Sequence, residues 1–379
     1  MTVNVSKPAI NVREKLAELD KPTGIAGEAM LRAETPQEQF NLIGAGRRRI
    51  NHNGSMRISQ RGTSSTSNGY LIDRYKSYNA TGATFTQSQG TTSPPEGFGH
   101  YLKINTDTAD TSIGSSDYFQ LSHIVEGQDV IGSGWGTSSA IPITLSFWVK
   151  SNVTGTYAVE IQTGSGSYES SHNYTVNASG VWEYKTVTFP AFTSTAIPMN
   201  NTAGFYLNWW LAAGSTWNTG TISPEWTTGN SGRASGQVNL FAAQNNYWQV
   251  TGVQLELGKV ATPFEHRSYG EELALCQRYY IQYELASYQR LAATSYCDIN
   301  NRTQVDISLP VPLRSYVSAG HTNLTISGQA VNGINLTQTG SNSNILTGNL
   351  TCPGTPLTVG TIYQIYAIGA GNFYVNGEL

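Results

Sequence analysis

The sequence predicts a mainly β protein, with short N-terminal helices, then a jelly-roll β-sandwich, then a second, smaller β-domain opened by a short helix. Three observations support this prediction. Charged residues make up only 12% of the chain, about half the usual share, while 39 residues are glycine. Apolar and polar residues alternate in several short runs, as in half-buried strands. Polar, glycine-rich segments separate these runs without a ten-residue helical pattern, which argues against a doubly wound α/β sheet.

Composition and charge exclude several classes of function. The formal net charge is −3 and the isoelectric point is about 6.1, so no global field attracts nucleic acid or anionic lipid. The cysteines are Cys276, Cys297 and Cys352, an odd number without a CxxC pair, which fits folding in a reducing cytosol. No secretory signal and no run of about 18 apolar residues is present. We therefore expect neither nucleic-acid binding nor membrane insertion.

Residues 1–50 carry most of the helix signals. A capping-box spacing at Asn11 opens the first predicted helix, and Thr35 followed by proline opens the second. Both are too short to bury much area against each other, so we expect them to pack on a partner. The alternative is a helical hairpin that folds back on the β-domain. The expected partner interface consists of Val12, Leu16, Leu19, Phe40, Leu42, Arg47 and Arg48.

A basic cluster follows these helices. Residues 47–61 contain five arginines but no interleaved aromatic residues. The sequence therefore favours salt bridges to an acidic partner surface, or a solvated face, over nucleic-acid binding.

Residues 51–266 form the predicted sandwich. The clearest alternation runs from Ile143 to Val149, and another runs from Tyr157 to Ile161. Gly155 lies between them, so the sequence predicts a β-hairpin with a tight turn. Further strands are expected at residues 70–75, 100–104, 182–189, 205–210 and 248–257.

Residues 267–379 form the second predicted β-domain. Glu271 and Glu272 open its short helix at the end where the helix dipole favours negative charge. The polar stretch 328–350 is interpreted as a turn-rich hairpin or an exposed loop. Strands are expected at residues 279–284, 303–309, 324–327, 361–367 and 373–375.

The search for catalytic chemistry is mostly negative. No nucleophile elbow, zinc-protease motif or phosphate-binding loop is present. Asn105, Asp107 and Asp110 resemble the start of a calcium loop, but Asp110 stands where glycine is required, which favours an ordinary polar turn. Carboxylates paired only in space stay possible, so a polysaccharide-degrading enzyme is the weakest alternative; its candidates are Glu160, Glu169, Glu183 and Glu225. We expect no enzyme, no metal and no cofactor.

Tryptophan provides the candidate ligand site. Trp209, Trp210, Trp217 and Trp226 fall within 18 residues. Exposed indole faces bind sugars through apolar stacking, and Trp217 and Trp226 lie in loop-like sequence. Trp217, Trp226 and Trp210 are therefore the candidate carbohydrate-binding residues, whereas Trp209 has the core phase of its strand. The alternative is that all four are core or subunit contacts.

Three stretches resemble a known family. They are VQLELGKVATPFEHRSYGEELALCQRYY at 253–280, RRRINHNGSMRISQRGTS at 47–64, and SKPAINVREKLAELDKPTGIAGEAMLRAETPQEQF at 6–40. They resemble tail-fibre and other appendage proteins of tailed bacteriophages, especially marine and cyanobacterial phages. In that family the first stretch ends a carbohydrate-binding-module-like jelly roll and leads into a C-terminal β-domain.

The resemblance implies a homotrimer without catalysis. It implies a virion-attachment segment at 1–50, a jelly roll at 51–266 and a C-terminal β-domain at 267–379. The chain would be a short tail fibre that joins other tail or capsid proteins by its N-terminus and binds a host-surface glycan or protein receptor. It would be assembled in the host cytoplasm and located in the virion. The alternative is a head- or neck-located fibre, decoration or adaptor protein without a receptor role.

Overall fold

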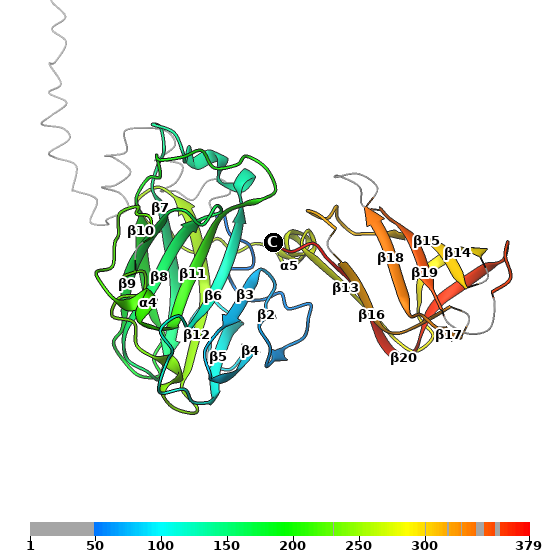
Figure 1. Cartoon of the computed structure of the whole chain (residues 1–379), viewed down its shortest axis with the longest axis horizontal. Coiled ribbons are helices and arrows are strands. Elements are labelled where there is room, and N and C mark those ends of the chain that lie inside the picture. Colours follow the sequence, from blue (N-terminus) through cyan, green and yellow to red (C-terminus); the bar gives the residue numbers. More distant parts are fainter. Residues whose placement is uncertain are drawn as a thin grey trace, which may run out of the picture. The chain divides into compact units, whose positions relative to one another are not determined.

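The computed structural model describes residues 49–379 apart from 230, 300, 317, 327, 339–344 and 353–356. Within these residues the chain is mainly β, as the sequence predicts, with three antiparallel sheets and few helices (Figure 1). The predicted N-terminal helices and all seven expected interface residues, from Val12 to Arg48, lie outside the described residues. None of the described helices is long and apolar enough to cross a membrane.

Two six-stranded antiparallel sheets form a jelly-roll-like β-sandwich. In order across the first sheet, the strands are β1 (Ser64–Ser65), β4 (Thr84–Gly90), β5 (Tyr101–Thr108), β12 (Tyr247–Leu257), β7 (Ile143–Ser151) and β10 (Glu183–Phe189). Across the second sheet they are β2 (Gly69–Tyr70), β3 (Tyr75–Asn79), β6 (Tyr118–Glu126), β11 (Ala203–Ala213), β8 (Gly155–Thr163) and β9 (Glu169–Val176). Short helices in the connections are η1 (Gly127–Ser133), α4 (Ser215–Asn218) and η2 (Leu240–Ala242).

The sandwich core is rich in aromatic side chains from both sheets. The ring of Trp209 in the second sheet lies 5.8 Å from Phe147 and 6.4 Å from Trp248 in the first sheet, measured between centroids. All three side chains are fully buried. Trp209 is thus a core residue, as the phase of its strand predicts. Large aromatic side chains bury much apolar area each, so they contribute strongly to this core.

The predicted hairpin around Gly155 is wrong. β7 pairs with β10 and β12, whereas β8 pairs with β9 and β11, so the two strands belong to opposite sheets. The chain crosses between the sheets near Gly155, whose φ of 127° suits glycine. Alternation identifies the buried face of a strand but not its hydrogen-bonded neighbour, and both strands bury that face in the same core.

The third sheet follows a helix that begins where the sequence predicts. α5 (Tyr269–Gln277) is capped by Ser268, whose side chain accepts a hydrogen bond from the Glu271 backbone N–H. The strands of the third sheet are β13 (Tyr280–Leu285), β14 (Arg290–Ile299), β15 (Arg302–Ser308), β16 (Ser318–Ile326), β17 (Gln329–Ala330), β18 (Gly333–Gln338), β19 (Ile345–Thr351) and β20 (Ile362–Asn376).

The order of this sheet is β17-β16-β20-β14-β15-β19-β18, and β13 also pairs with β20. β18 and β19 pair as antiparallel neighbours, so the turn-rich hairpin predicted for this polar stretch is confirmed. β20 unites two strands that the sequence places separately at 361–367 and 373–375. The sheet buries its own apolar cluster, separate from the sandwich core.

The arginine cluster makes ion pairs within the chain. Arg49 bonds the buried carboxylate of Glu272 in α5, which also accepts a hydrogen bond from the Asn53 backbone N–H. Arg61 contacts Asp73 and Glu378 at 3.4 and 3.2 Å. The expectation of a partner surface or a solvated face is therefore wrong for these two arginines. Sequence spacing could not reveal it because the acidic partners of Arg49 and Arg61 include residues more than 200 positions away.

Candidate functional site

The strongest candidate site in the sandwich lies on the face of the second sheet that points away from the core. Because successive side chains in a strand point to opposite faces, burying Phe205, Leu207 and Trp209 turns Tyr206 and Asn208 outward. The neighbouring strands alternate in the same way. We call this surface the outer-face groove; its lining residues are Lys76, Tyr78, Gln120, Ser122, Ile124, Gln162, Tyr206 and Asn208.

The groove has a volume of about 210 Å³. Its lining residues belong to β3, β6, β11 and β8, which are neighbours in the second sheet (Figure 1). Strand register aligns its side chains in rows. Tyr206 is the partner of Ile124 on one side and of Gln162 on the other. Tyr78 is the partner of Gln120. Each of these two rows thus places an aromatic or aliphatic side chain beside an amide.

A hydrogen-bond network forms the central row. The Ser122 hydroxyl donates to the Asn208 amide oxygen at 2.6 Å, and the Asn208 amide nitrogen donates to Glu160 at 3.1 Å. The Ser171 hydroxyl also donates to Glu160 at 3.3 Å. The Asn208 amide is therefore held in a single orientation, which reduces the entropy lost when a ligand binds beside it.

Arg233 completes this network from the loop that follows α4. Its Nε lies 2.7 Å and its Nη2 lies 2.6 Å from the two Glu160 oxygens. Glu160 is fully buried, so this two-point pair supplies the charge compensation that its carboxylate needs. Burial alone would lower the pKa of Arg233, but the hydrogen bonds and charge of Glu160 raise it above its ordinary value.

Stacked aromatic rings lie at the end of the groove near Tyr78. The Tyr78 side chain is 45% exposed, and its ring stacks on Tyr118 with 5.3 Å between centroids. Tyr118 in turn contacts Trp210 and Trp217 at 5.7 and 5.6 Å. Tyr78 thus presents an accessible ring that the half-buried Tyr118 supports from behind.

The predicted carbohydrate-binding tryptophans lie behind this surface. Trp210 is only 1% exposed, under Tyr118, Trp217 and the Arg233 guanidinium, so its ring is not open to a ligand. Trp217 is half-buried, and its indole N–H donates to the Ser116 carbonyl at 3.0 Å. Neither Trp210 nor Trp217 lines the outer-face groove; the aromatic rings that line it are those of Tyr78 and Tyr206.

Trp226 occupies a different place. It is half-buried, and its ring lies 5.2 Å from Trp135 and 4.7 Å from Phe192. Its indole N–H donates to the Pro190 carbonyl at 2.9 Å. Trp226 therefore packs as an extension of the sandwich core.

The candidate carboxylates do not combine into an evident acid–base pair. Glu160 is paired with Arg233. Burial alone would raise the pKa of Glu183, but hydrogen bonds from Lys185, Ala178 and Asn177 hold it at about 2, too low for a general acid at neutral pH. Within the part of the chain that the structure describes, no group of three or more His, Cys, Asp or Glu side chains is placed to hold a metal ion.

The outer-face groove suits a hydroxylated ligand bound weakly. It combines an exposed ring with amide and hydroxyl groups in an open, shallow surface, as carbohydrate sites require. Sequence reasoning missed it because β6 was not predicted, although Phe119, Leu121 and His123 alternate with polar Gln120 and Ser122. That alternation was the available signal.

Comparisons with known proteins add a likeness of fold. No protein-family model matches the chain, and no curated protein matches it. Among solved structures, an arabinose-bound α-L-arabinofuranosidase is 12% identical over 61% of this chain and 30% of that chain, with a TM-score of 0.33. The enzymatically active domain of tailspike protein 4 from bacteriophage CBA120 is 11% identical over 55% and 21%, with a TM-score of 0.30.

A family 11 carbohydrate-binding module of a Clostridium thermocellum cellulosomal cellulase is 11% identical over 53% of this chain and 98% of that chain, with a TM-score of 0.27. The chain spans less than a third of the length of the arabinofuranosidase and of the tailspike domain. Similarities of this size establish no shared function.

Proposed function

We propose that this chain is a structural protein of a phage virion, a short homotrimeric tail fibre that binds carbohydrate on the host surface through the outer-face groove. The single observation that carries the binding role is the juxtaposition of the exposed Tyr78 ring with the Gln120 side chain in the lining of the groove. A sugar ring stacks its apolar face on an aromatic side chain and exchanges hydrogen bonds with amides.

The virion role is supported by the sequence. Residues 253–280 and 47–64 resemble phage appendage proteins, and 1–50 resembles their attachment segment. A small groove binds weakly on its own. Three copies in a trimer, repeated over several fibres, raise the effective concentration of sites and give avidity without any new contact.

Competition with phage adsorption tests the receptor role. We expect purified full-length protein to block adsorption of the parent phage to its host at saturating concentration. Absence of competition would instead support the head or neck decoration role. Release of reducing ends from host glycan would support an enzyme.

Matched variants test the groove itself. The double variant Tyr78→Ala/Tyr206→Ala should weaken binding to host glycan at least about tenfold, because it removes both rings that line the groove. Tyr184→Ala in the first sheet is the control, since Tyr184 is also 45% exposed but does not line the groove. Equal binding by the double variant and the control would rule out this site.

The attachment role has its own test. Deleting residues 2–48 should leave a folded protein that no longer joins the virion. The deletion stops before Arg49 because that residue is buried and bonds Glu272, and the Ile50 N–H donates to the Leu255 carbonyl at 2.8 Å. Virions that still carry the shortened protein would contradict the proposal.

A further inference from the structure

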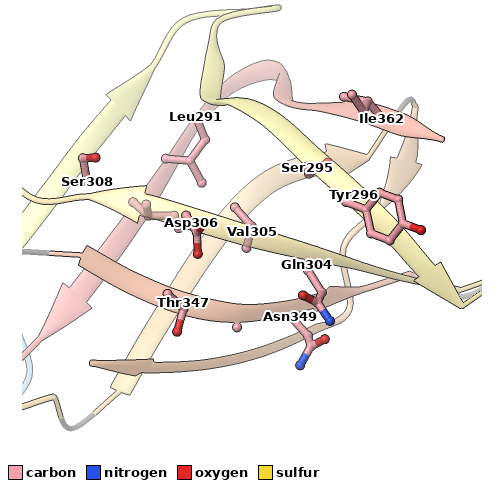
Figure 2. A pocket seen from close by; sticks show the side chains of 12 residues that line it. Leu291, Ser295, Tyr296, Gln304, Val305, Asp306, Ser308, Thr347, Asn349 and Ile362 are labelled. Atoms are coloured by element: carbon pink, nitrogen blue, oxygen red, sulfur yellow. The ribbon is translucent and has the colours of Figure 1, made fainter. Parts of the chain in front are cut away.

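A second, larger groove lies on the third sheet. It has a volume of about 820 Å³ and is lined by residues of β14, β15, β19 and β20 (Figure 2). We call it the C-terminal groove; its lining residues are Leu291, Ser295, Tyr296, Gln304, Val305, Asp306, Ile307, Ser308, Thr347, Gly348, Asn349 and Ile362. It shares no residue with the outer-face groove.

Strand register places four of these side chains in one row across the sheet. Tyr296 is the partner of Ile362 on one side and of Gln304 on the other, and Gln304 is the partner of Asn349. At roughly 4.8 Å between strands, the row is about 14 Å long. It therefore has an apolar half, Ile362 and Tyr296, and an amide half, Gln304 and Asn349, as Figure 2 shows.

The apolar half is accessible. Ile362 is 64% exposed and Tyr296 is 51% exposed, whereas the flanking Ser295 and Cys297 are buried. A large ring and an aliphatic side chain exposed side by side form a platform for an apolar surface of about the same width.

The amide half carries unused hydrogen-bonding capacity. The Asn349 amide oxygen is buried, and no hydrogen-bond partner for it exists among the described residues. A buried acceptor without a partner is costly, and a donor supplied by a ligand removes that cost. The carboxylate of Asp306, one row along the strand, likewise forms no ion pair with the described part of the chain.

Gly348, next to Asn349, lies close to the neighbouring strand β18. A Cβ atom at Gly348 would lie 2.1 Å from the Asn335 carbonyl oxygen of β18. Glycine is therefore required there for β18 and β19 to approach each other.

The charge of the groove selects among ligands. Its twelve described lining residues include one carboxylate, Asp306, and no lysine, arginine or histidine. Such a surface repels phosphate, sulfate and uronate groups. It matches a neutral ligand that has an apolar face and several hydroxyl donors, which is the chemistry of a neutral sugar.

We propose that the C-terminal groove is a second carbohydrate-binding site, specific for neutral oligosaccharides. A sugar ring stacks on Tyr296 and Ile362, and its hydroxyls donate to Asn349 and Asp306. This inference does not depend on the outer-face groove. Two sites in one chain would let the protein hold two positions along a glycan.

A glycan array probed with the full-length protein tests the proposal. The array carries neutral glucans, galactans and mannans beside uronate- and phosphate-containing glycans. Tyr296→Ala should lose a set of neutral signals that the Tyr78→Ala/Tyr206→Ala variant retains, with affinity lowered at least about tenfold. Tyr296→Phe should retain these signals, and so should the matched control Tyr288→Ala, which removes a 73% exposed ring outside the groove.

Asn349→Ala separates recognition from structural support. It removes an acceptor that has no partner among the described residues, so we expect weaker glycan binding without a lower urea midpoint. Identical arrays for the native protein and Tyr296→Ala, including arrays without any signal, would overturn the proposal. Dissociation of an oligomer by Tyr296→Ala in light scattering would also overturn it, because the groove would then be an interface between copies of the chain.

Discussion

Arg233 bonds Glu160 at two points, with 2.7 and 2.6 Å between the guanidinium nitrogens and the carboxylate oxygens. Glu160 lies in β8 of the second sheet, and Arg233 lies in the connection between β11 and β12, so this pair ties a long loop to the sheet. The same carboxylate holds Asn208, which lines the outer-face groove. The loop therefore positions the site without lining it.

Replacing Arg233 should destabilise the fold strongly. Arg233→Ala leaves the fully buried Glu160 carboxylate without its cation, a change that costs about 3–5 kcal/mol when one partner of a buried pair is removed. It also removes the guanidinium that lies 5.3 Å from the Trp210 ring centroid. Urea unfolding of the variant and the native protein measures this cost.

The matched control is Arg302→Ala. Arg302 pairs with Asp298 four residues earlier, and its side chain is 36% exposed. Such pairs contribute little because water screens them, so the control should unfold close to the native midpoint. Equal losses in the two variants would contradict the structural role of the Arg233 pair.

Trp226→Ala should act on stability. Because Trp226 packs against Trp135 and Phe192 but is only half-buried, we expect a loss of about 2–3 kcal/mol, less than for a fully buried tryptophan. Thermal unfolding and glycan binding measured on the same sample check this. A variant with native stability that no longer binds glycan would instead support the sugar role predicted from the sequence.

Acidification should destabilise the protein. Burial, together with the nearby charge of Arg74, holds the pKa of His52 and His123 well below the usual value. The unfolded chain protonates these imidazoles near pH 6.5 and the folded chain does not, so stability is lost as the pH falls below about 6.5. Each histidine contributes up to about 1.4 kcal/mol per pH unit.

Protonation of Asp73 has the opposite effect on the stability of the protein. Burial raises the pKa of Asp73 to about 6, so the folded chain binds this proton more tightly than the unfolded chain. Its contribution to stability grows as the pH falls from about 6 to about 4. Burial also raises the pKa of Asp129 to about 6. The net change on acidification is still a loss, because the two imidazoles act from about pH 6.5 downward and burial lowers the pKa of the four other histidines as well. Urea unfolding at pH 7.5 and pH 5 should show it, and His123→Phe should reduce it; an unchanged loss in His123→Phe would refute this assignment.

Glu378→Ala should also destabilise the protein. Glu378 bonds the buried Arg74, which also donates to the Ile124 carbonyl and lies 3.4 Å from the Tyr279 ring centroid. Removing the carboxylate leaves a buried guanidinium without its anion, at a cost of about 3 kcal/mol or more. Glu284→Ala, at an exposed position in β13, is the control for urea unfolding. A native midpoint for Glu378→Ala would show that Arg74 is compensated in another way.

Local patterns in the sequence predicted much of the fold. The alternation at 143–149 and the core phase of Trp209 correctly identified buried faces, and Glu271 and Glu272 lie in the first turn of α5 as the helix dipole predicts. These features depend on residues a few positions apart. β6 was missed although its residues alternate. The polar residues that line the groove separate its apolar residues, so β6 has no continuous apolar run in this part.

By itself the sequence determined the fold class, the positions of several strands along the chain and the scarcity of catalytic motifs, because these follow from periodicity and composition. Only the tertiary structure decided which strands pair, so it separated β7 from β8 and joined Arg49 to Glu272. It also decided that Tyr78 is exposed and Trp210 is covered. The physical reason is that burial and strand pairing depend on contacts between segments far apart in the chain, and local alternation carries no information about those contacts.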